Sequence, residues 1–152
     1  MISPELLRRY PLFAGQDYEM LKKMAMLATE EEKDVNKWVF FEGEVAKTMY
    51  LILDGAVSLT MNMGESGDKR LEKLAPIKEG ELVGWSALIP PHTYNLGAQA
   101  VEKTRLVAFD GGAMRKLLDD NPVYGYYFMS NIAGVIGQRL VSKCAQLMSI
   151  LV

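Results

Sequence analysis

The feature that most constrains the fold is a series of short apolar segments between residues 37 and 109, separated by turn-forming residues. The first three segments cover residues 37–41, 49–53 and 56–63. Gly43-Glu44 and Asp54-Gly55 lie between them, and such pairs favour tight turns. Further strand candidates follow at residues 70–77, 82–83 and 98–109, and residues 64–68 are expected to form a hairpin loop. About eight short strands at this spacing predict a closed antiparallel β-roll, similar to a jelly roll.

The segment at residues 56–63 shows how these strands should face the core. Val57, Leu59, Met61 and Met63 alternate with Ser58, Thr60 and Asn62. Successive side chains of a strand point to opposite faces of its sheet. We therefore expect the apolar set to lie in the core and the polar set to face water or a cavity.

Helical signals flank the strands on both sides. Ser3 can cap a first short helix, since Pro4 suits the first helical position, and Asp17 can cap a second helix. The charged run at residues 30–34 is expected to be a solvated helix end. These signals predict one mainly β domain, of the α+β type, with helices over residues 1–34, a β-roll over 35–110 and helices over 111–152.

A long C-terminal helix is predicted from about Tyr124 onward, after a short helix that ends at Asn121-Pro122. Its apolar residues recur at steps of three and four, at Met129, Ile132, Ile136, Leu140, Cys144, Leu147 and Leu151. The stripe could pack along its own domain or against the same helix of a second copy. Because it continues to the last residues, a homodimer through this helix is the expected arrangement.

Composition excludes several classes of function. Seventeen Lys and Arg against nineteen Asp and Glu give a net charge of -2, so no phosphate-neutralising surface for nucleic acid is indicated. One Cys, Cys144, and one His, His92, cannot form a zinc cluster, and no metal or cofactor is expected. The sequence shows no catalytic triad, paired catalytic carboxylates or P-loop, so an enzyme is not expected. It also shows no signal peptide and no apolar run long enough to span a membrane, which favours a cytoplasmic protein.

A larger set of residues in the front half of the chain carries a family resemblance. Trp38, Gly43-Glu44, Ala46, Tyr50, Ile52, Gly55 and Val57 stand at the spacing of a Gly-Glu turn, a Tyr-x-Ile strand and a Gly-x-Val strand. This pattern resembles the cyclic-nucleotide-binding domains, such as the sensor half of the catabolite activator and related bacterial regulators. The resemblance covers nearly the whole chain. It implies a β-roll flanked by helices, with a regulatory, ligand-sensing role.

The family resemblance leaves three forms of that role open. The family's transcription factors carry a helix-turn-helix domain after the long helix, whereas this sequence ends within or just after that helix. We therefore expect a stand-alone module that does not bind nucleic acid directly. The alternatives are the effector domain of a transcription regulator, and a protein-interaction domain that binds no small molecule.

The resemblance also implies a phosphate-binding cassette of the form Gly-x-x-x-Gly-Glu-x-Ala-Leu, followed by Arg-Ser-Ala or Arg-Thr-Ala. On this chain Gly80 and Gly84 match the two glycines, but Trp85 stands at the acidic position and Leu96 at the arginine position. Glu81 falls at a variable position of the cassette. The candidate site residues are therefore Gly84, Trp85, Ser86, Ala87, Leu88, Leu96, Gly97 and Ala98.

The two replacements remove the groups that a cyclic nucleotide needs. A carboxylate for the ribose hydroxyl and a guanidinium for the phosphate each form charge-assisted bonds of about 1.5 to 3 kcal/mol. Their joint loss predicts affinities no tighter than roughly 100 μM for cyclic AMP and cyclic GMP. The amides near Gly84–Ser86 could still favour an anion.

Three states of the pocket remain open: a cavity filled by Trp85 and Leu96, an apolar pocket for another small molecule, and an intact cyclic-nucleotide site. A filled or nearly filled cavity, walled by Trp85, Leu88, Leu96 and Ala98, is the expected state. Any remaining ligand should then have an apolar body and a polar or anionic tip. Arg139, Lys143 and His92 could each supply a replacement cation, but surface roles are expected for them.

Overall fold

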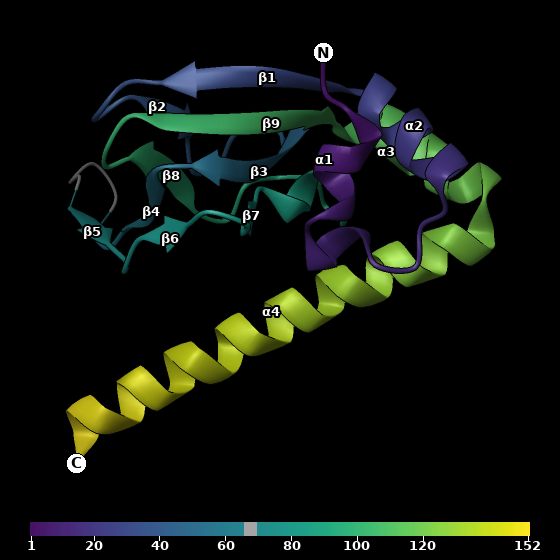
Figure 1. Ribbon diagram of the computed structural model, residues 1–152. Coiled ribbons are helices and arrows are strands. Elements are labelled where there is room, and N and C mark those ends of the chain that lie inside the picture. Colours follow the sequence, from purple (N-terminus) through teal and green to yellow (C-terminus); the bar gives the residue numbers. More distant parts are fainter. Residues whose placement is uncertain (66–69) are drawn as a thin grey trace.

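The computed structural model describes residues 1–65 and 70–152. Two antiparallel sheets form a roll, short helices gather at one end of it, and a single long helix leaves from that end (Figure 1). The helices are α1 (Pro4–Arg8), η1 (Pro11–Phe13), α2 (Tyr18–Met26), η2 (Trp85–Ala87), α3 (Gly111–Asp120) and α4 (Pro122–Leu151). The predicted order of helices, antiparallel roll and long C-terminal helix is confirmed.

The strands of the described residues are β1 (Ala28–Lys33), β2 (Trp38–Phe40), β3 (Thr48–Asp54), β4 (Ala56–Asn62), β5 (Leu71–Lys73), β6 (Ile77–Lys78), β7 (Leu82–Val83), β8 (Gly97–Ala100) and β9 (Thr104–Asp110). One sheet has the order β1-β9-β3-β7, and the other has the order β2-β8-β4-β5 with β6 also paired to β4. Strands distant in sequence are therefore neighbours, which brings residues 40, 59, 83 and 94–96 to one side of the roll.

The predicted helix caps at the N-terminus are present. The Ser3 hydroxyl accepts a hydrogen bond from the Leu6 amide at 3.1 Å, and the Asp17 carboxylate accepts one from the Met20 amide at 2.8 Å. At the same end of the roll, the Phe13 ring lies 5.8 Å from the Phe109 ring and 5.7 Å from the Phe128 ring. These aromatic contacts join η1, β9 and α4 in one core.

The boundary between helices and roll was predicted incorrectly. Residues 28–33 form β1, an exposed edge strand, and not a solvated helix end. β1 pairs with β9 along its whole length, from Ala28 with Phe109 to Lys33 with Thr104. Arg105 holds Glu30 through two hydrogen bonds of 2.6 and 2.9 Å. A run of charges is compatible with an edge strand, because such charges oppose edge-to-edge association.

Three other local expectations need correction. The strand expected at 70–77 is divided into β5 and β6, and that at 98–109 into β8 and β9, with intervening residues outside the strands. In β4, Ser58 and Thr60 are buried, whereas Met61 is 41% exposed; Met63, directly after the strand, is 53% exposed. The end of β4 beyond Thr60 pairs only with the short β5, so its apolar side chains are left uncovered. The loop expected at 64–68 falls mostly outside the described residues.

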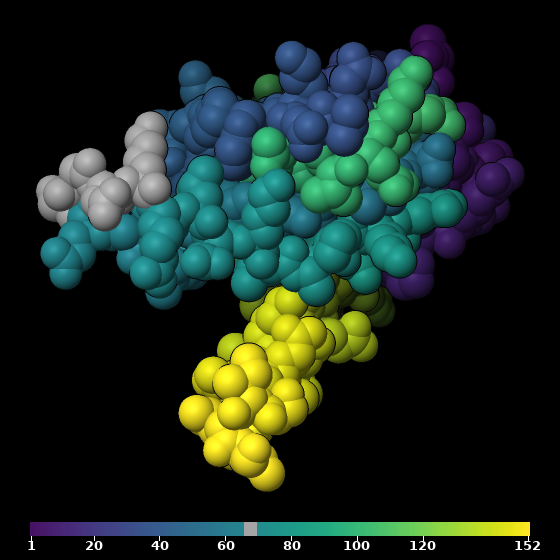
Figure 2. Space-filling model, turned by 90° about the vertical axis from the view of Figure 1, so that its left-hand side faces the viewer, coloured from purple at the N-terminus to yellow at the C-terminus, as the bar shows by residue number. Residues whose placement is uncertain are grey.

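The long helix α4 has a packed half and an exposed half. Phe128 and Ile132 are fully buried, and Asn131 donates hydrogen bonds to the Leu12 and Ala14 carbonyls. Leu140, Leu147 and Leu151 are 63%, 56% and 70% exposed. Figure 2 shows this half of α4 projecting from the body of the molecule. The first part of the apolar stripe therefore packs on its own domain, and the second part is uncovered.

Candidate functional site

The second glycine of the cassette, Gly84, directly follows β7. This glycine has a φ of +80°, in the left-handed region that favours glycine. A Cβ atom at this position would lie 3.0 Å from the Thr48 carbonyl oxygen and 3.3 Å from the Phe40 and Tyr94 rings. A larger residue at this position would therefore be strained in its backbone and would crowd two aromatic rings. Gly84 turns the chain into η2, which carries Trp85 and Ser86.

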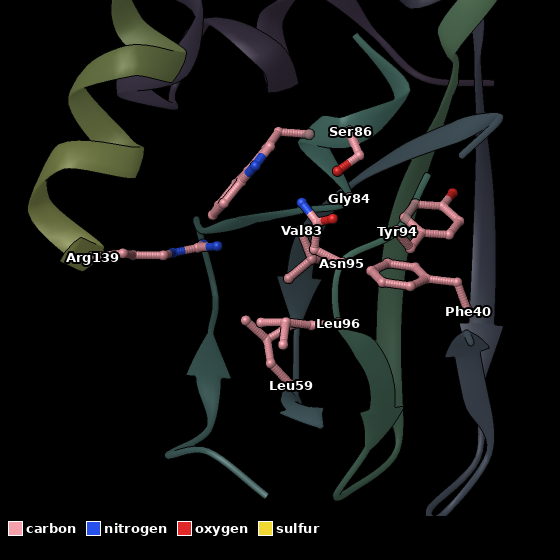
Figure 3. A pocket seen from close by; sticks show the side chains of 10 residues that line it. Phe40, Leu59, Val83, Gly84, Ser86, Tyr94, Asn95, Leu96 and Arg139 are labelled. Atoms are coloured by element: carbon pink, nitrogen blue, oxygen red, sulfur yellow. The ribbon is translucent and has the colours of Figure 1, made fainter. Parts of the chain in front are cut away.

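A small cavity of about 60 Å³ lies beside this turn. Its lining, shown in Figure 3, consists of Phe40, Leu59, Val83, Gly84, Trp85, Ser86, Tyr94, Asn95, Leu96 and Arg139. A water molecule occupies about 30 Å³ in the liquid, and ligand pockets usually have volumes of about 300 to 1,000 Å³. The cavity therefore has room for only a few water molecules and is much smaller than an ordinary ligand pocket.

Two aromatic rings occupy one side of the cavity. The rings of Phe40 and Tyr94 stack with their centroids 3.9 Å apart and an angle of 12° between their planes (Figure 3). The Tyr94 hydroxyl donates a hydrogen bond to the Thr48 carbonyl at 2.6 Å and accepts one from the Thr48 amide at 3.2 Å. The Tyr50 ring lies 6.0 Å beyond Phe40. The stack is therefore attached to β3 at both ends, through the Tyr94 hydroxyl at Thr48 and through Tyr50, which belongs to β3.

Burial of this aromatic group affects its titration. Loss of hydration raises the pKa of Tyr94, and it raises the pKa of Tyr50 to about 12, with a smaller contribution from the Glu31 charge at Tyr50. Both phenols are therefore neutral at physiological pH. They serve as packing groups with one hydrogen-bonding end.

Arg139 extends from α4 and closes the side of the cavity that lies across from Phe40 and Tyr94. Its guanidinium carbon lies 5.0 Å from the centre of the Trp85 ring, within the range of a cation–π interaction. Nη2 donates a hydrogen bond to the Leu82 carbonyl and lies 3.8 Å from the Glu81 carboxylate. Nη1 is buried and has no hydrogen-bond partner among residues 1–65 and 70–152. Burial lowers the pKa of Arg139, and the Glu81 charge partly opposes that change.

Arg139 and His92 do not have the surface roles that were expected. The Arg139 side chain is only 18% exposed and points toward the cavity (Figure 3). His92 is half-buried, with Nδ1 2.9 Å from the Ser86 carbonyl oxygen. Arg115 donates a hydrogen bond to the Ala87 carbonyl at 2.7 Å and lies 3.2 Å from His92 Nδ1. His92 and Arg115 therefore support the backbone of the cassette.

The structure brings together only part of the predicted site. Gly84, Trp85, Ser86 and Leu96 line the cavity, whereas Ala87, Leu88, Gly97 and Ala98 are buried outside its lining. Of the four residues expected to wall the cavity, Trp85 and Leu96 do so, whereas the expectation for Leu88 and Ala98 is wrong. The ligand-binding role of the predicted residues stays a prediction.

Sequence reasoning missed several lining residues: Phe40, Leu59, Val83, Tyr94 and Asn95. Tyr94 and Asn95 directly precede Leu96, so a wider window around that position would have included them. Phe40 and Leu59 could not be found in this way, because only the pairing of β2 and β4 with β8 brings them to the cassette.

A larger space of about 480 Å³ lies between the roll and α4. We call it the α4 groove. Its lining residues are Pro11, Leu12, Leu59, Leu74, Ala75, Pro76, Ile77, Gly80, Glu81, Leu82, Val135, Gln138, Arg139, Ser142, Lys143 and Gln146. Leu59 and Arg139 line both the cavity and the α4 groove, so these two side chains separate the spaces.

Within the described residues, no group of three or more His, Cys, Asp or Glu side chains could hold a metal ion. None of the helices described is both long enough and apolar enough to cross a membrane.

Comparison with known proteins gives a consistent family. The model of the family described as "Cyclic nucleotide-binding domain" matches residues 31–121. A solved structure of a proposed cyclic nucleotide-binding protein from Geobacter metallireducens GS-15 is 31% identical, with 92% of this chain and 99% of that chain covered and a TM-score of 0.82. The N-terminal domain of a transcriptional regulator from Streptomyces coelicolor A3(2) is 26% identical, with 94% of each chain covered and a TM-score of 0.68.

A curated relative from Rhodopseudomonas palustris is a proposed potassium channel protein. It is 24% identical over 147 residues, which cover 97% of this chain. The chain spans only 34% of that relative's length. Similar domains are thus found in proteins of different overall organisation.

Proposed function

This chain belongs to the cyclic nucleotide-binding domain family, and on that premise we propose that it is a regulatory module that does not bind cyclic AMP or cyclic GMP in the usual way. The observation that carries the proposal is the small volume of the cavity. Phe40, Tyr94 and Trp85 leave only about 60 Å³ at the cassette. That volume is several times smaller than an ordinary ligand pocket.

The chemistry of the cavity supports the same proposal. Among residues 1–65 and 70–152, no carboxylate that could accept a hydrogen bond from a ribose hydroxyl lines the cavity. Its one cation, Arg139, already interacts with Trp85 and the Leu82 carbonyl. A nucleotide would therefore have to displace the aromatic stack and redirect Arg139 before it could bind. Both steps reduce its affinity.

Isothermal titration calorimetry with cyclic AMP and cyclic GMP tests the proposal. We expect dissociation constants no tighter than roughly 100 μM, since the two charge-assisted contacts are missing. Arg139→Ala should weaken any residual binding, whereas Arg8→Ala, an exposed arginine on α1, should leave it unchanged. A low-micromolar constant for either nucleotide in the unmodified protein would show that the proposal is wrong.

A regulatory module also needs a surface that transmits its state, and the exposed half of α4 is the best candidate. Leu140, Leu147 and Leu151 form one uncovered apolar stripe at steps of seven and four residues. Such a stripe suits pairing with the same helix of a second copy. We therefore include a homodimer through α4 in the proposed function. A cytoplasmic location and the absence of direct nucleic acid binding stay predictions.

A further inference from the structure

The two walls of the α4 groove differ in their chemistry. The roll contributes mainly apolar side chains, which are Leu59, Leu74, Ala75, Pro76, Ile77 and Leu82. Helix α4 contributes mainly polar side chains, which are Gln138, Arg139, Ser142, Lys143 and Gln146, with Val135 at one end. An apolar wall thus lies opposite a polar helix face.

This arrangement is the reverse of ordinary helix packing, in which the apolar stripe of a helix faces the body of its domain. The residues on α4 that line the groove recur at steps of three and four, so they form one continuous face. Among the described residues of that wall, the Leu82 carbonyl is the group that accepts a hydrogen bond from this face, from Arg139 Nη2. Contact between the walls would bury the polar side chains of α4 without partners, which is unfavourable. A space of about 480 Å³ lies between the two walls, a volume within the usual range for ligand sites.

The charges in the α4 groove favour an anion. Arg139 and Lys143 are four residues apart and share the helix face, while Glu81 is the one acidic residue of the lining. Glu81 lies near Nη2 of Arg139, and Nη1 of the same side chain is buried without a partner in the described part of the chain. Among residues 1–65 and 70–152, Lys143 forms no ion pair or hydrogen bond. Arg139 and Lys143 therefore both line the groove, and neither the Lys143 ammonium nor Arg139 Nη1 has a polar partner among residues 1–65 and 70–152.

We propose that the α4 groove binds an organic monoanion with a slender apolar body, such as a medium-chain carboxylate. The anionic group contacts the Arg139 guanidinium and the Lys143 ammonium, and the apolar body lies on the Leu74–Leu82 wall of the roll. Such a ligand bridges the roll and α4, and so couples binding to the position of the helix. The inference rests on the proposed regulatory role of the domain, but not on its weak affinity for cyclic nucleotides.

Calorimetry with decanoate below its micelle-forming concentration tests this site in the full chain. We expect saturable binding of decanoate and a rise in the thermal unfolding midpoint. 1-Decanol has the same chain length without the charge, and should bind about ten-fold more weakly or worse, because it lacks the charge-assisted contacts. Decyltrimethylammonium should not bind measurably. Equal affinities for decanoate and 1-decanol would overturn the proposed role of the cations.

Two substitutions locate the binding. Lys143→Gln should weaken decanoate binding about ten-fold without changing the fold, since this side chain forms no ion pair or hydrogen bond within the described part of the chain. Lys37→Gln, which removes an exposed lysine outside the groove, is the matched control and should have no effect. Leu74→Gln should weaken decanoate and 1-decanol alike. If decanoate binds the unmodified protein no more tightly than Lys143→Gln, or not at all, the site is not present.

The failure of this inference can be distinguished from failure of the proposed function. Tight binding of cyclic AMP together with saturable decanoate binding would contradict the cyclic-nucleotide proposal and leave the α4 groove site supported. Weak binding of both cyclic AMP and decanoate would overturn the groove site alone.

Discussion

The cavity at the cassette and the α4 groove share Leu59 and Arg139, yet one is nearly filled and the other is open. In the cavity the facing groups complement one another, because Phe40 stacks on Tyr94 and Arg139 stacks on Trp85. In the groove an apolar wall of the roll faces a polar side of α4. The difference shows that chemical complementarity between facing walls, and not their distance from the core, determines where this domain retains space.

The largest expected effect comes from removing the aromatic stack. Phe40→Ala should lower the free energy of unfolding by about 3 to 5 kcal/mol, because it deletes a buried ring that contacts both Tyr94 and Tyr50. Leu74→Ala is the matched change in the groove wall and should cost less than about 1 kcal/mol, since Leu74 is partly exposed. Chemical denaturation measures both values. Similar costs for the two variants would contradict the distinction between a packed cavity and an open groove.

High pH should also destabilise the packed region. The folded state raises the pKa of Tyr50 from 10.0 to about 12, so the stabilisation is complete below about pH 10 and is lost as the pH rises toward 12. The shift corresponds to a loss of at most about 2 to 3 kcal/mol. Tyrosinate absorbance and denaturation midpoints between pH 9 and 12 measure the effect.

Tyr50→Phe is the control for this titration, because it keeps the ring and removes the ionisable hydroxyl. The variant should retain more of its stability at high pH than the unmodified protein. Tyr94 has a pKa raised in the same direction, so part of the pH dependence should remain. An unchanged pH profile in Tyr50→Phe would show that Tyr50 is not the responsible group.

Much of the fold could be predicted from local sequence signals. Ser3 and Asp17 cap their helices as expected, and the turn pairs divide the first strands correctly. Residues 28–33 could not be assigned locally, because pairing with β9 determines their conformation. Burial was misjudged where coverage depends on distant segments, as at Met61.

The candidate site was less predictable than the fold. The cassette pattern located Gly84, Trp85, Ser86 and Leu96, since these residues lie within one local motif. It could not show that Arg139 crosses from α4 to Trp85, because the path of a long helix depends on packing at its other end. The chemical mismatch in the α4 groove likewise arises only when the helix face and the sheet wall are placed opposite each other.

Trp85→Ala should have an intermediate effect. A completely filled cavity with Trp85 as a core residue would predict a loss of about 3 to 5 kcal/mol. The cavity is indeed nearly filled, but Trp85 is half-buried and stacks on Arg139 near the surface, so we expect a loss of about 1 to 2 kcal/mol. Trp38→Ala is the matched control, because Trp38 is also half-buried and stacks on Phe41. Of these two variants, only Trp85→Ala should change the affinity for decanoate, since Trp85 contacts Arg139 and Trp38 stacks on Phe41 instead.

The smallest effect on stability is expected for Leu140→Glu, a change that should instead alter assembly. Leu140 is 63% exposed, so the substitution should cost the isolated domain less than about 0.5 kcal/mol. In a dimer through α4, it would place two carboxylates at the seam and prevent association. Light scattering at micromolar concentration should show a dimer for the unmodified protein and for Ala145→Glu, which changes the neighbouring side of the helix, but a monomer for Leu140→Glu. A monomeric unmodified protein would contradict the proposed dimer, because a dimer through α4 requires this stripe to be covered by its own copy.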